Sequence, residues 1–295
     1  MTKIVSMIFA ATIFGVVVNA QALKTPQPST TQKISQEFGI GTIDLSYSRP
    51  NSKGRKIFGD LVPFGKLWRT GANTATRLKF SNDVTFAGQP LKAGEYSLFT
   101  MPNQQSWTII LNTDAKVKGV FEYKKEDDVL TATVPSEDMV KMPVAKLKKG
   151  EAAPVVKGLE TFTMQFANIT NTSCELHIMW ENTAVKIPIT VNIDGDVMKQ
   201  IDKLMNVDSK PYFNAAVYYA DNGKDLNQAL TWFNKAEEMN PKAYWVKYQK
   251  AKCLQKLGKK AEALETSKLS SVLAKEADNQ DYVKLNETLQ AELAK

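Results

Sequence analysis

Two stretches of different periodicity predict a multidomain β + α protein, in which an antiparallel β-sandwich-like domain precedes an all-α region. As far as about residue 193, short β-branched or aromatic runs alternate with turn residues. No helical pattern lies between these runs, which favours a sandwich or barrel over a parallel sheet. After residue 194 proline becomes rare and apolar residues recur with a helical period. We expect the β domain over 34–194 and the helices over 197–294.

The first twenty residues are predicted to be a signal peptide, and residues 21–33 a flexible leader. Lys3 is the only charged residue among the first twenty-three and precedes the apolar stretch Ile4–Val18. Val18 and Ala20 occupy the small-residue positions before a cut at Gln21, which completes the order of a secretory signal. The stretch is shorter than the ~20 apolar residues of a membrane span, and no Cys follows it for a lipid anchor. We therefore expect an exported protein, periplasmic or secreted, without a stable membrane anchor.

The strands of the β domain are predicted from short runs divided by turn residues. In the first of them Ile43, Leu45 and Tyr47 share one side and are expected to face the core. A long loop with four lysines and two prolines is expected over Met142–Lys157. The expected strands are Ile40–Ser48, Thr76–Phe80, Val84–Phe86, Glu95–Met101, Ser106–Asn112, Val129–Val134, Thr161–Ala167, Glu175–Glu181 and Ala184–Val191.

The helical region contains a repeat that resembles the tetratricopeptide motif. Ala263 follows Ala229 by thirty-four residues, which is the period of that motif. Small residues at this position let two antiparallel helices approach closely. The second unit has Ser267 and Ser270 where the motif has Phe and Ala. The spacing of the motif's second half is present in Ala229, Phe233, Ala236 and Pro241. We expect tetratricopeptide-like helical hairpins, which take part of their burial from the β domain or from a partner protein.

Composition restricts the classes of function. The net charge of +7 comes from lysines spread along the chain, which suits solubility better than a nucleic-acid surface. His177 is the only histidine, and Cys174 and Cys253 are the only cysteines, so a His/Cys metal cluster is not available. We predict no metal, no other cofactor and no nucleic-acid partner. His177 is expected to be structural. A disulfide would have to bridge the two domains; export permits it, but nothing demands it.

The four arginines of the chain are concentrated in one segment, whereas the lysines are scattered. Arg49, Arg55, Arg69 and Arg77 fall within twenty-nine residues. Arginine is required where a planar guanidinium must grip a carboxylate or phosphate, or stack on an aromatic ring. The segment 49–77 is therefore predicted to do something that the rest of the surface does not.

This part of the chain resembles the exported domain-of-unknown-function family DUF2911, whose members are found chiefly in Bacteroidetes-type bacteria. The resemblance covers roughly residues 34–193 and implies no activity, because none is established for the family. It rests on Ser48-Arg-Pro50, Lys53-Gly-Arg55, Ile57-Phe-Gly59, Val62-Pro63, Trp68-Arg-Thr-Gly-Ala-Asn73, Ala93-Gly-Glu-Tyr-Ser-Leu-Phe99, Trp107-Thr-Ile-Ile-Leu-Asn112, Trp180-Glu181 and Val185–Ile189.

Three hypotheses compete for the arginine segment. In the first, Arg49 and Arg69 pair with buried carboxylates, such as those of Asp44, Asp83 or Glu181, and lock the β domain. In the second, the segment forms an anionic-ligand site with Trp68 as a platform. In the third, Glu181 or Asp60 acts as a general base and Arg69 stabilises charge. The predicted ligand-binding residues are Arg49, Lys53, Arg55, Trp68, Arg69 and Asn73.

The function expected from these features is that of an exported, non-enzymatic binding or interaction protein of the bacterial envelope. Its partners would be a protein bound by the helical region and an anionic small molecule or glycan bound by segment 49–77. The alternative is a hydrolase-like enzyme that acts on envelope glycans or related acidic substrates. That enzyme would need Glu181, Asp60 or His177 in one cleft together with Arg69.

Overall fold

The computed structural model describes residues 25–139, 158–207 and 210–295. The chain divides into two compact units between Asn192 and Ile193. The predicted signal peptide and the predicted loop Met142–Lys157 lie outside the described residues. Within the described residues no helix is both long and apolar enough to span a membrane.

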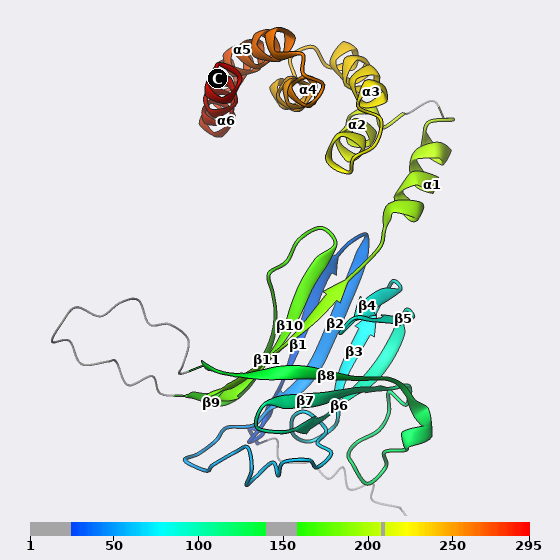
Figure 1. The fold of residues 1–295 in the computed structure, drawn as a ribbon, viewed down its shortest axis with the longest axis vertical. Coiled ribbons are helices and arrows are strands. Elements are labelled where there is room, and N and C mark those ends of the chain that lie inside the picture. The colour runs from blue at the N-terminus through cyan, green and yellow to red at the C-terminus, as the bar shows by residue number, and fades with distance from the viewer. Residues whose placement is uncertain (1–24, 140–157, 208–209) are drawn as a thin grey trace, which may run out of the picture. The chain divides into compact units, whose positions relative to one another are not determined.

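The first unit is an antiparallel, nearly barrel-like sheet, which confirms the predicted β domain (Figure 1). Its neighbouring strands follow the order β1-β2-β3-β6-β7-β8-β11-β10-β9, and the short β4–β5 hairpin pairs with β11. The strands are β1 (Thr30–Phe38), β2 (Gly41–Arg49), β3 (Thr76–Phe80), β4 (Val84–Phe86), β5 (Gln89–Leu91), β6 (Gly94–Pro102), β7 (Ser106–Asn112), β8 (Asp128–Asp138), β9 (Leu159–Ala167), β10 (Ser173–Glu181) and β11 (Thr183–Thr190).

Two strands were not predicted, β1 and β5, and β1 begins at Thr30 within the expected leader. β8 extends to Asp138, four residues beyond the predicted strand Val129–Val134. β1 has few apolar residues because most of its side chains are exposed or half-buried. It is held by backbone pairing with β2 along its whole length. Alternation of apolar residues therefore could not reveal it.

The sheet approaches closure where the chain leaves β2. Beyond Arg49, Asn51 pairs with Thr161 of β9 in an antiparallel bridge. The Phe162 amide donates to the Pro50 carbonyl at 2.9 Å, and the Ser52 amide to the Glu160 carbonyl at 2.7 Å. The first and last parts of the β unit are thereby joined by backbone hydrogen bonds.

Large side chains fill the interior of this sheet. As predicted, Ile43, Leu45 and Tyr47 of β2 are buried. An aromatic cluster consists of Phe58, Trp68, Trp107, Phe162 and Trp180, whose rings meet mostly edge to face. Such pairs contribute about 0.5–1.5 kcal/mol each beyond the area they bury.

The second unit is all α and consists of six helices among the described residues. Antiparallel neighbours pack as α2 on α3, α4 on α5 and α5 on α6. Ala229 and Ala263 are both fully buried, as expected for small residues where helices approach closely. The helices are α1 (Asp194–Leu204), α2 (Tyr212–Asp221), α3 (Leu226–Met239), α4 (Tyr244–Lys256), α5 (Lys260–Glu276) and α6 (Gln280–Leu293).

The two serines that depart from the repeat pattern form a buried polar cluster between α5 and α6. Ser267 donates to Asn286 Oδ1 at 2.9 Å, and Asn286 Nδ2 donates to Ser270 Oγ at 2.9 Å. Ser270 in turn donates to the Tyr244 carbonyl at 2.8 Å. All three side chains are fully or almost fully buried. Because their polar atoms are paired, the cluster fixes the register of these helices without leaving an unsatisfied group.

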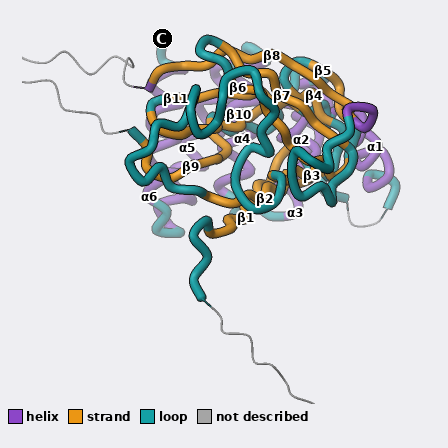
Figure 2. Tube along the Cα trace, turned by 90° about the horizontal axis from the view of Figure 1, so that it is seen from below, coloured by secondary structure: helices purple, strands orange, loops and turns teal. Residues whose placement is uncertain are grey.

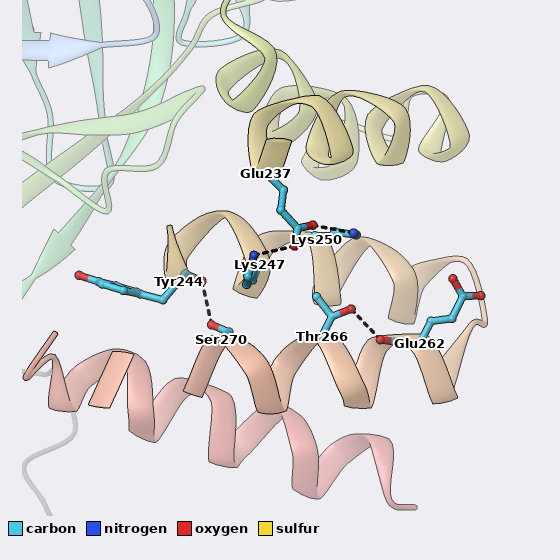
Figure 3. A network of polar contacts seen from close by, with 7 residues as sticks. All are labelled: Glu237, Tyr244, Lys247, Lys250, Glu262, Thr266 and Ser270. Carbon is cyan, nitrogen blue, oxygen red and sulfur yellow. Dashed lines mark hydrogen bonds and ion pairs between the residues drawn. The ribbon is translucent and has the colours of Figure 1, made fainter. Parts of the chain in front are cut away.

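A second polar group joins α3 to α4. The Glu237 carboxylate accepts hydrogen bonds from Lys247 at 2.6 Å and from Lys250 at 2.7 Å (Figure 3). The Lys247 side chain is only 4% exposed. Burial raises the pKa of the Glu237 carboxyl, but the hydrogen bonds and charges of the two lysines outweigh burial and lower that pKa overall.

Cys174 and Cys253 are both free and buried, each in its own unit. Burial raises the pKa of the Cys174 thiol to about 11, so this thiol is protonated at neutral pH.

Candidate functional site

The long connection between β2 and β3 forms one end of the β unit. In Figure 1 it is the blue chain below the strands, and Figure 2 shows loops of the β unit, in teal, across this end. It contains two of the four arginines, Arg55 and Arg69, and every predicted ligand-binding residue except Arg49, which is the last residue of β2.

Arg49 closes the sheet and does not face a ligand site. Its Nε donates to the Phe162 carbonyl at 3.2 Å, and its Nη2 donates to Thr163 Oγ1 at 3.0 Å. The adjacent Tyr47 hydroxyl donates to the Met164 carbonyl at 2.9 Å and accepts from the Met164 amide at 2.8 Å. Arg49 thus locks the domain as the first hypothesis expected, but through a carbonyl and a hydroxyl of β9.

Two of the three carboxylates proposed as partners of Arg49 and Arg69 bind other residues. Asp44 accepts a hydrogen bond from Ser35, and Asp83 accepts from Lys92. The expected arginine–carboxylate pairs are therefore wrong for these two residues. Asp44 lies opposite Ser35 of β1, and Asp83 lies directly before β4.

Lys53 and Asn73 hold the connection in place. The Lys53 amide donates to the Glu160 carboxylate at 2.7 Å, and Ser52 Oγ donates to the same carboxylate. Asn73 Nδ2 donates to the Ser29 carbonyl at 3.0 Å and to Ser48 Oγ at 3.2 Å. Neither Lys53 nor Asn73 lines the cavity described below.

The turn Trp68–Gly71 is strained and tightly held. Thr70 is β-branched but has a φ of 54°, and Gly71 has a φ of 147°, conformations that cost of order 1–3 kcal/mol in a non-glycine residue. The Trp68 amide donates to the Thr100 carbonyl at 2.7 Å, and Thr70 Oγ1 to Thr100 Oγ1 at 3.1 Å. Backbone strain of this kind clusters at functional sites.

Beside this turn lies a cavity of about 430 Å³, which we call the Arg69 pocket. Among the described residues, its lining contains three cations and one serine, and the remaining residues are glycine or largely apolar. The lining residues are Ser29, Pro50, Arg55, Leu61, Val62, Pro63, Lys66, Leu67, Trp68, Arg69, Gly71, Ala72, Val120 and Trp180. Its volume falls within the range of small-molecule sites.

Charge in the Arg69 pocket is of one sign. Arg55, Lys66 and Arg69 line it, and among the described residues no Asp or Glu does. Arg55 donates from Nε to the Ser52 carbonyl at 2.9 Å and from Nη2 to the Asn51 carbonyl at 2.8 Å, which fixes its guanidinium. In the part of the chain that is described, no hydrogen bond or ion pair reaches the Arg69 guanidinium. A half-buried guanidinium with its donors unused can receive an anion.

The candidate catalytic residues do not meet Arg69. Glu181 lines a different cavity, with Lys56 and Trp107, and Asp60 is not among the described residues that line the Arg69 pocket. His177 is mostly buried on β10 and contacts Glu175 at 2.7 Å, a contact that lowers the pKa of the Glu175 carboxyl. The cleft that a hydrolase would need, with an acid or His177 beside Arg69, is not formed by these residues.

A comparison with protein-family models matches residues 29–189 to DUF2911, described as a protein of unknown function. The chain belongs to this family. The match begins at Ser29, which lines the Arg69 pocket, and covers nearly the whole β unit. The pocket therefore belongs to the DUF2911 domain. The match does not identify a ligand. No curated protein and no solved structure shows a significant match.

Sequence reasoning found three residues of the pocket and missed others. Arg55, Trp68 and Arg69 were predicted, whereas Lys66, Val120 and Trp180 were not assigned to the site. Trp180 could have been suspected because it belongs to the family resemblance. Nothing in the sequence brings Val120 to Arg69, since the five strands β3 to β7 lie between them in the chain.

Proposed function

We propose that this protein is an exported, non-enzymatic binding protein, and that its DUF2911 domain binds an anionic ligand in the Arg69 pocket. The observation that carries the proposal is a half-buried Arg69, with two further cations and no acid among the described residues that line the same cavity. Clustered cations in a concave site focus a positive potential and attract anions. The separation of Arg69 from Glu181 favours binding over hydrolysis.

We further propose that α2–α6 form tetratricopeptide-like hairpins and bind a partner protein. The thirty-four-residue spacing of Ala229 and Ala263 supports this. So does the exposure of apolar residues on the helices, of which Met239 is 70% exposed and Val272 is 52% exposed. Exposed apolar side chains on a repeat surface are suited to contacts with a protein.

Isothermal titration calorimetry with simple anions tests the proposal for the β unit. Inorganic phosphate, glucuronate and octanoate are titrated into the wild-type protein and into Arg69→Met, which keeps most of the aliphatic stem. We expect at least one anion to bind, and Arg69→Met to weaken it by about tenfold or more because a charge-assisted hydrogen bond is lost. Lys56→Met is the matched control, since Lys56 belongs to the same segment but lines the other cavity.

The melting temperature separates binding from structure. Arg69→Met should melt within about 2 °C of wild type, because the Arg69 guanidinium forms no hydrogen bond or ion pair with the described residues. If Arg69→Met unfolds the β unit and no anion binds the wild-type protein, Arg69 is a structural residue and the proposal fails.

A further inference from the structure

The side chains that line the Arg69 pocket offer a ligand's hydroxyl groups few neutral hydrogen-bonding partners. Apart from the cations and the two indole groups, Ser29 has the only polar side chain among the described residues that line the pocket. A sugar presents many hydroxyls, and they outnumber the partners that these side chains provide, so some would lose hydrogen bonds to water without replacement. The lining therefore disfavours a polyhydroxylated anion, although a glycan was one of the expected partners.

The two tryptophans that line the pocket present only apolar surface to it. Their rings stack at 6.1 Å with an interplanar angle of 19°. Trp68 Nε1 donates to the Gly71 carbonyl at 3.1 Å, and Trp180 Nε1 donates to the Glu160 carbonyl at 3.2 Å. Since both indole donors are used within the protein, a ligand meets ring faces and edges, which favour an apolar group.

The rim of the pocket is apolar and exposed. Leu61 is 44% exposed and Val120 is 45% exposed, and both line the pocket. Phe121, the next residue, is 79% exposed. Exposed apolar residues gathered at the edge of a cavity mark a surface that becomes covered on binding.

The loop that presents Val120 and Phe121 is anchored on both sides and approaches Arg69. Val117 is buried with Ala75, Phe99 and Ile110 in a core cluster, and the Tyr123 hydroxyl donates to the Asp128 carboxylate at 2.5 Å. A Cβ atom added to Gly119 would lie only 3.4 Å from Arg69 Nη1. The charged group of Arg69 and the apolar tip of the loop are therefore neighbours.

From these four observations we propose that the Arg69 pocket binds an amphipathic anion, in which one carboxylate is joined to an aliphatic or aromatic body. The carboxylate pairs with the guanidinium of Arg69, and the apolar body covers Trp68, Leu61 and Val120. This inference rests on the proposed anion-binding function and specifies the class of ligand.

Calorimetric titration of the full-length protein with matched probes tests the inference. Octanoate carries both the charge and the apolar body, glucuronate carries the charge with hydroxyls, and octanol carries the apolar body without the charge. We expect octanoate to bind at least about tenfold more tightly than either of the other probes, with a negative heat-capacity change from apolar burial.

Two variants assign the contributions of charge and apolar surface. Arg69→Met should weaken the binding of octanoate by about tenfold or more and leave the affinity for octanol unchanged, because only the charged partner is lost. Val120→Ser should weaken the binding of octanoate and of octanol alike by about threefold to tenfold, because apolar contact is lost. Lys56→Met should leave all three affinities unchanged.

The outcomes separate this inference from the proposed function. If glucuronate binds as tightly as octanoate and Arg69→Met abolishes both, the pocket binds anions but the amphipathic class is wrong. If octanol binds as tightly as octanoate, the pocket recognises apolar groups only, and both proposals fail. If none of the anions binds, both fail as well.

Discussion

At the scale of single residues, two arginines of one segment have different roles. Arg49 uses its donors on β9 of the same domain, while the described residues provide no acceptor for Arg69. Arginine content alone identified the segment, but it could not distinguish these roles. The distinction depends on Phe162 and Thr163, which lie more than a hundred residues away in the sequence.

Arg49→Met should destabilise the β unit. The variant loses two hydrogen bonds from a charged group, which together contribute about 1.5–3 kcal/mol. Urea denaturation followed by tryptophan fluorescence measures the free energy of unfolding. Arg77→Met is the control, because the Arg77–Glu95 pair is long, at 4.0 Å, and more than a third exposed, so its loss should be hardly measurable. Equal effects of the two substitutions would contradict a closing role for Arg49.

Gly71→Ala should disrupt the turn that carries Arg69. With a φ of 147° the position is strained for alanine, and the new Cβ would lie 3.0 Å from the Ser48 carbonyl oxygen. We expect a loss of about 2–4 kcal/mol in the free energy of unfolding. Gly54→Ala provides the comparison, because its φ is also positive but nothing lies within 4 Å of the added Cβ; it should cost about 1–2 kcal/mol. If both variants lose the same free energy of unfolding, the close contact at Gly71 does not contribute to stability.

At the scale of secondary-structure elements, the strongly patterned segments could be predicted and the others could not. Ser106–Asn112 was predicted with its observed bounds, since its β-branched and aromatic residues are buried in the centre of the sheet. β1 and β5 escaped prediction because edge pairing through the backbone leaves no apolar alternation in the sequence. Close helix packing predicted that Ala229 and Ala263 would be small and buried. The role of Ser267 and Ser270 could not be predicted, because it depends on hydrogen bonds to Asn286 of another helix.

The Glu237 carboxylate should be essential to the α3–α4 contact. Glu237→Gln leaves Lys247 charged and buried without an anion, which costs about 3–5 kcal/mol for a fully buried pair and somewhat less here. Helix melting followed by circular dichroism at 222 nm measures this loss. Glu238→Gln is the matched control, because the neighbouring Glu238–Lys235 pair is exposed and should contribute less than about 1 kcal/mol. If both variants melt alike, the buried pair does not stabilise the helices.

The same carboxylate predicts acid sensitivity of the helical unit. The pKa of Glu237 is lowered in the folded state, so its contribution to stability is fully present above the unfolded value of about 4.3. This contribution is lost as the pH falls through the lower folded pKa. Helix melting between pH 7 and pH 3 should show the loss in the wild-type protein, and Glu237→Gln should show a smaller one. A pH dependence that is the same in both proteins would contradict the assignment.

At the scale of the whole molecule, each unit contains its own core. Phe99, Trp107 and Trp180 are buried in the β unit, and Phe233 and Ala263 in the helical unit. All residues that line the Arg69 pocket belong to the β unit. A chain truncated after Asn192 should therefore remain folded, with the near-ultraviolet dichroism of its tryptophan cluster intact, and should bind octanoate as the full-length protein does. Loss of this signal on truncation would show that the β unit depends on the helices.

The most direct test of the central claim is a crystal structure of the full-length protein grown with 8-bromooctanoate, in which anomalous scattering locates the bromine. We predict the carboxylate within hydrogen-bond distance of the Arg69 guanidinium and the bromine against the apolar surface of Trp68 and Val120. A bound ligand with its carboxylate at another cation, or an empty Arg69 pocket at saturating concentration, would contradict the account.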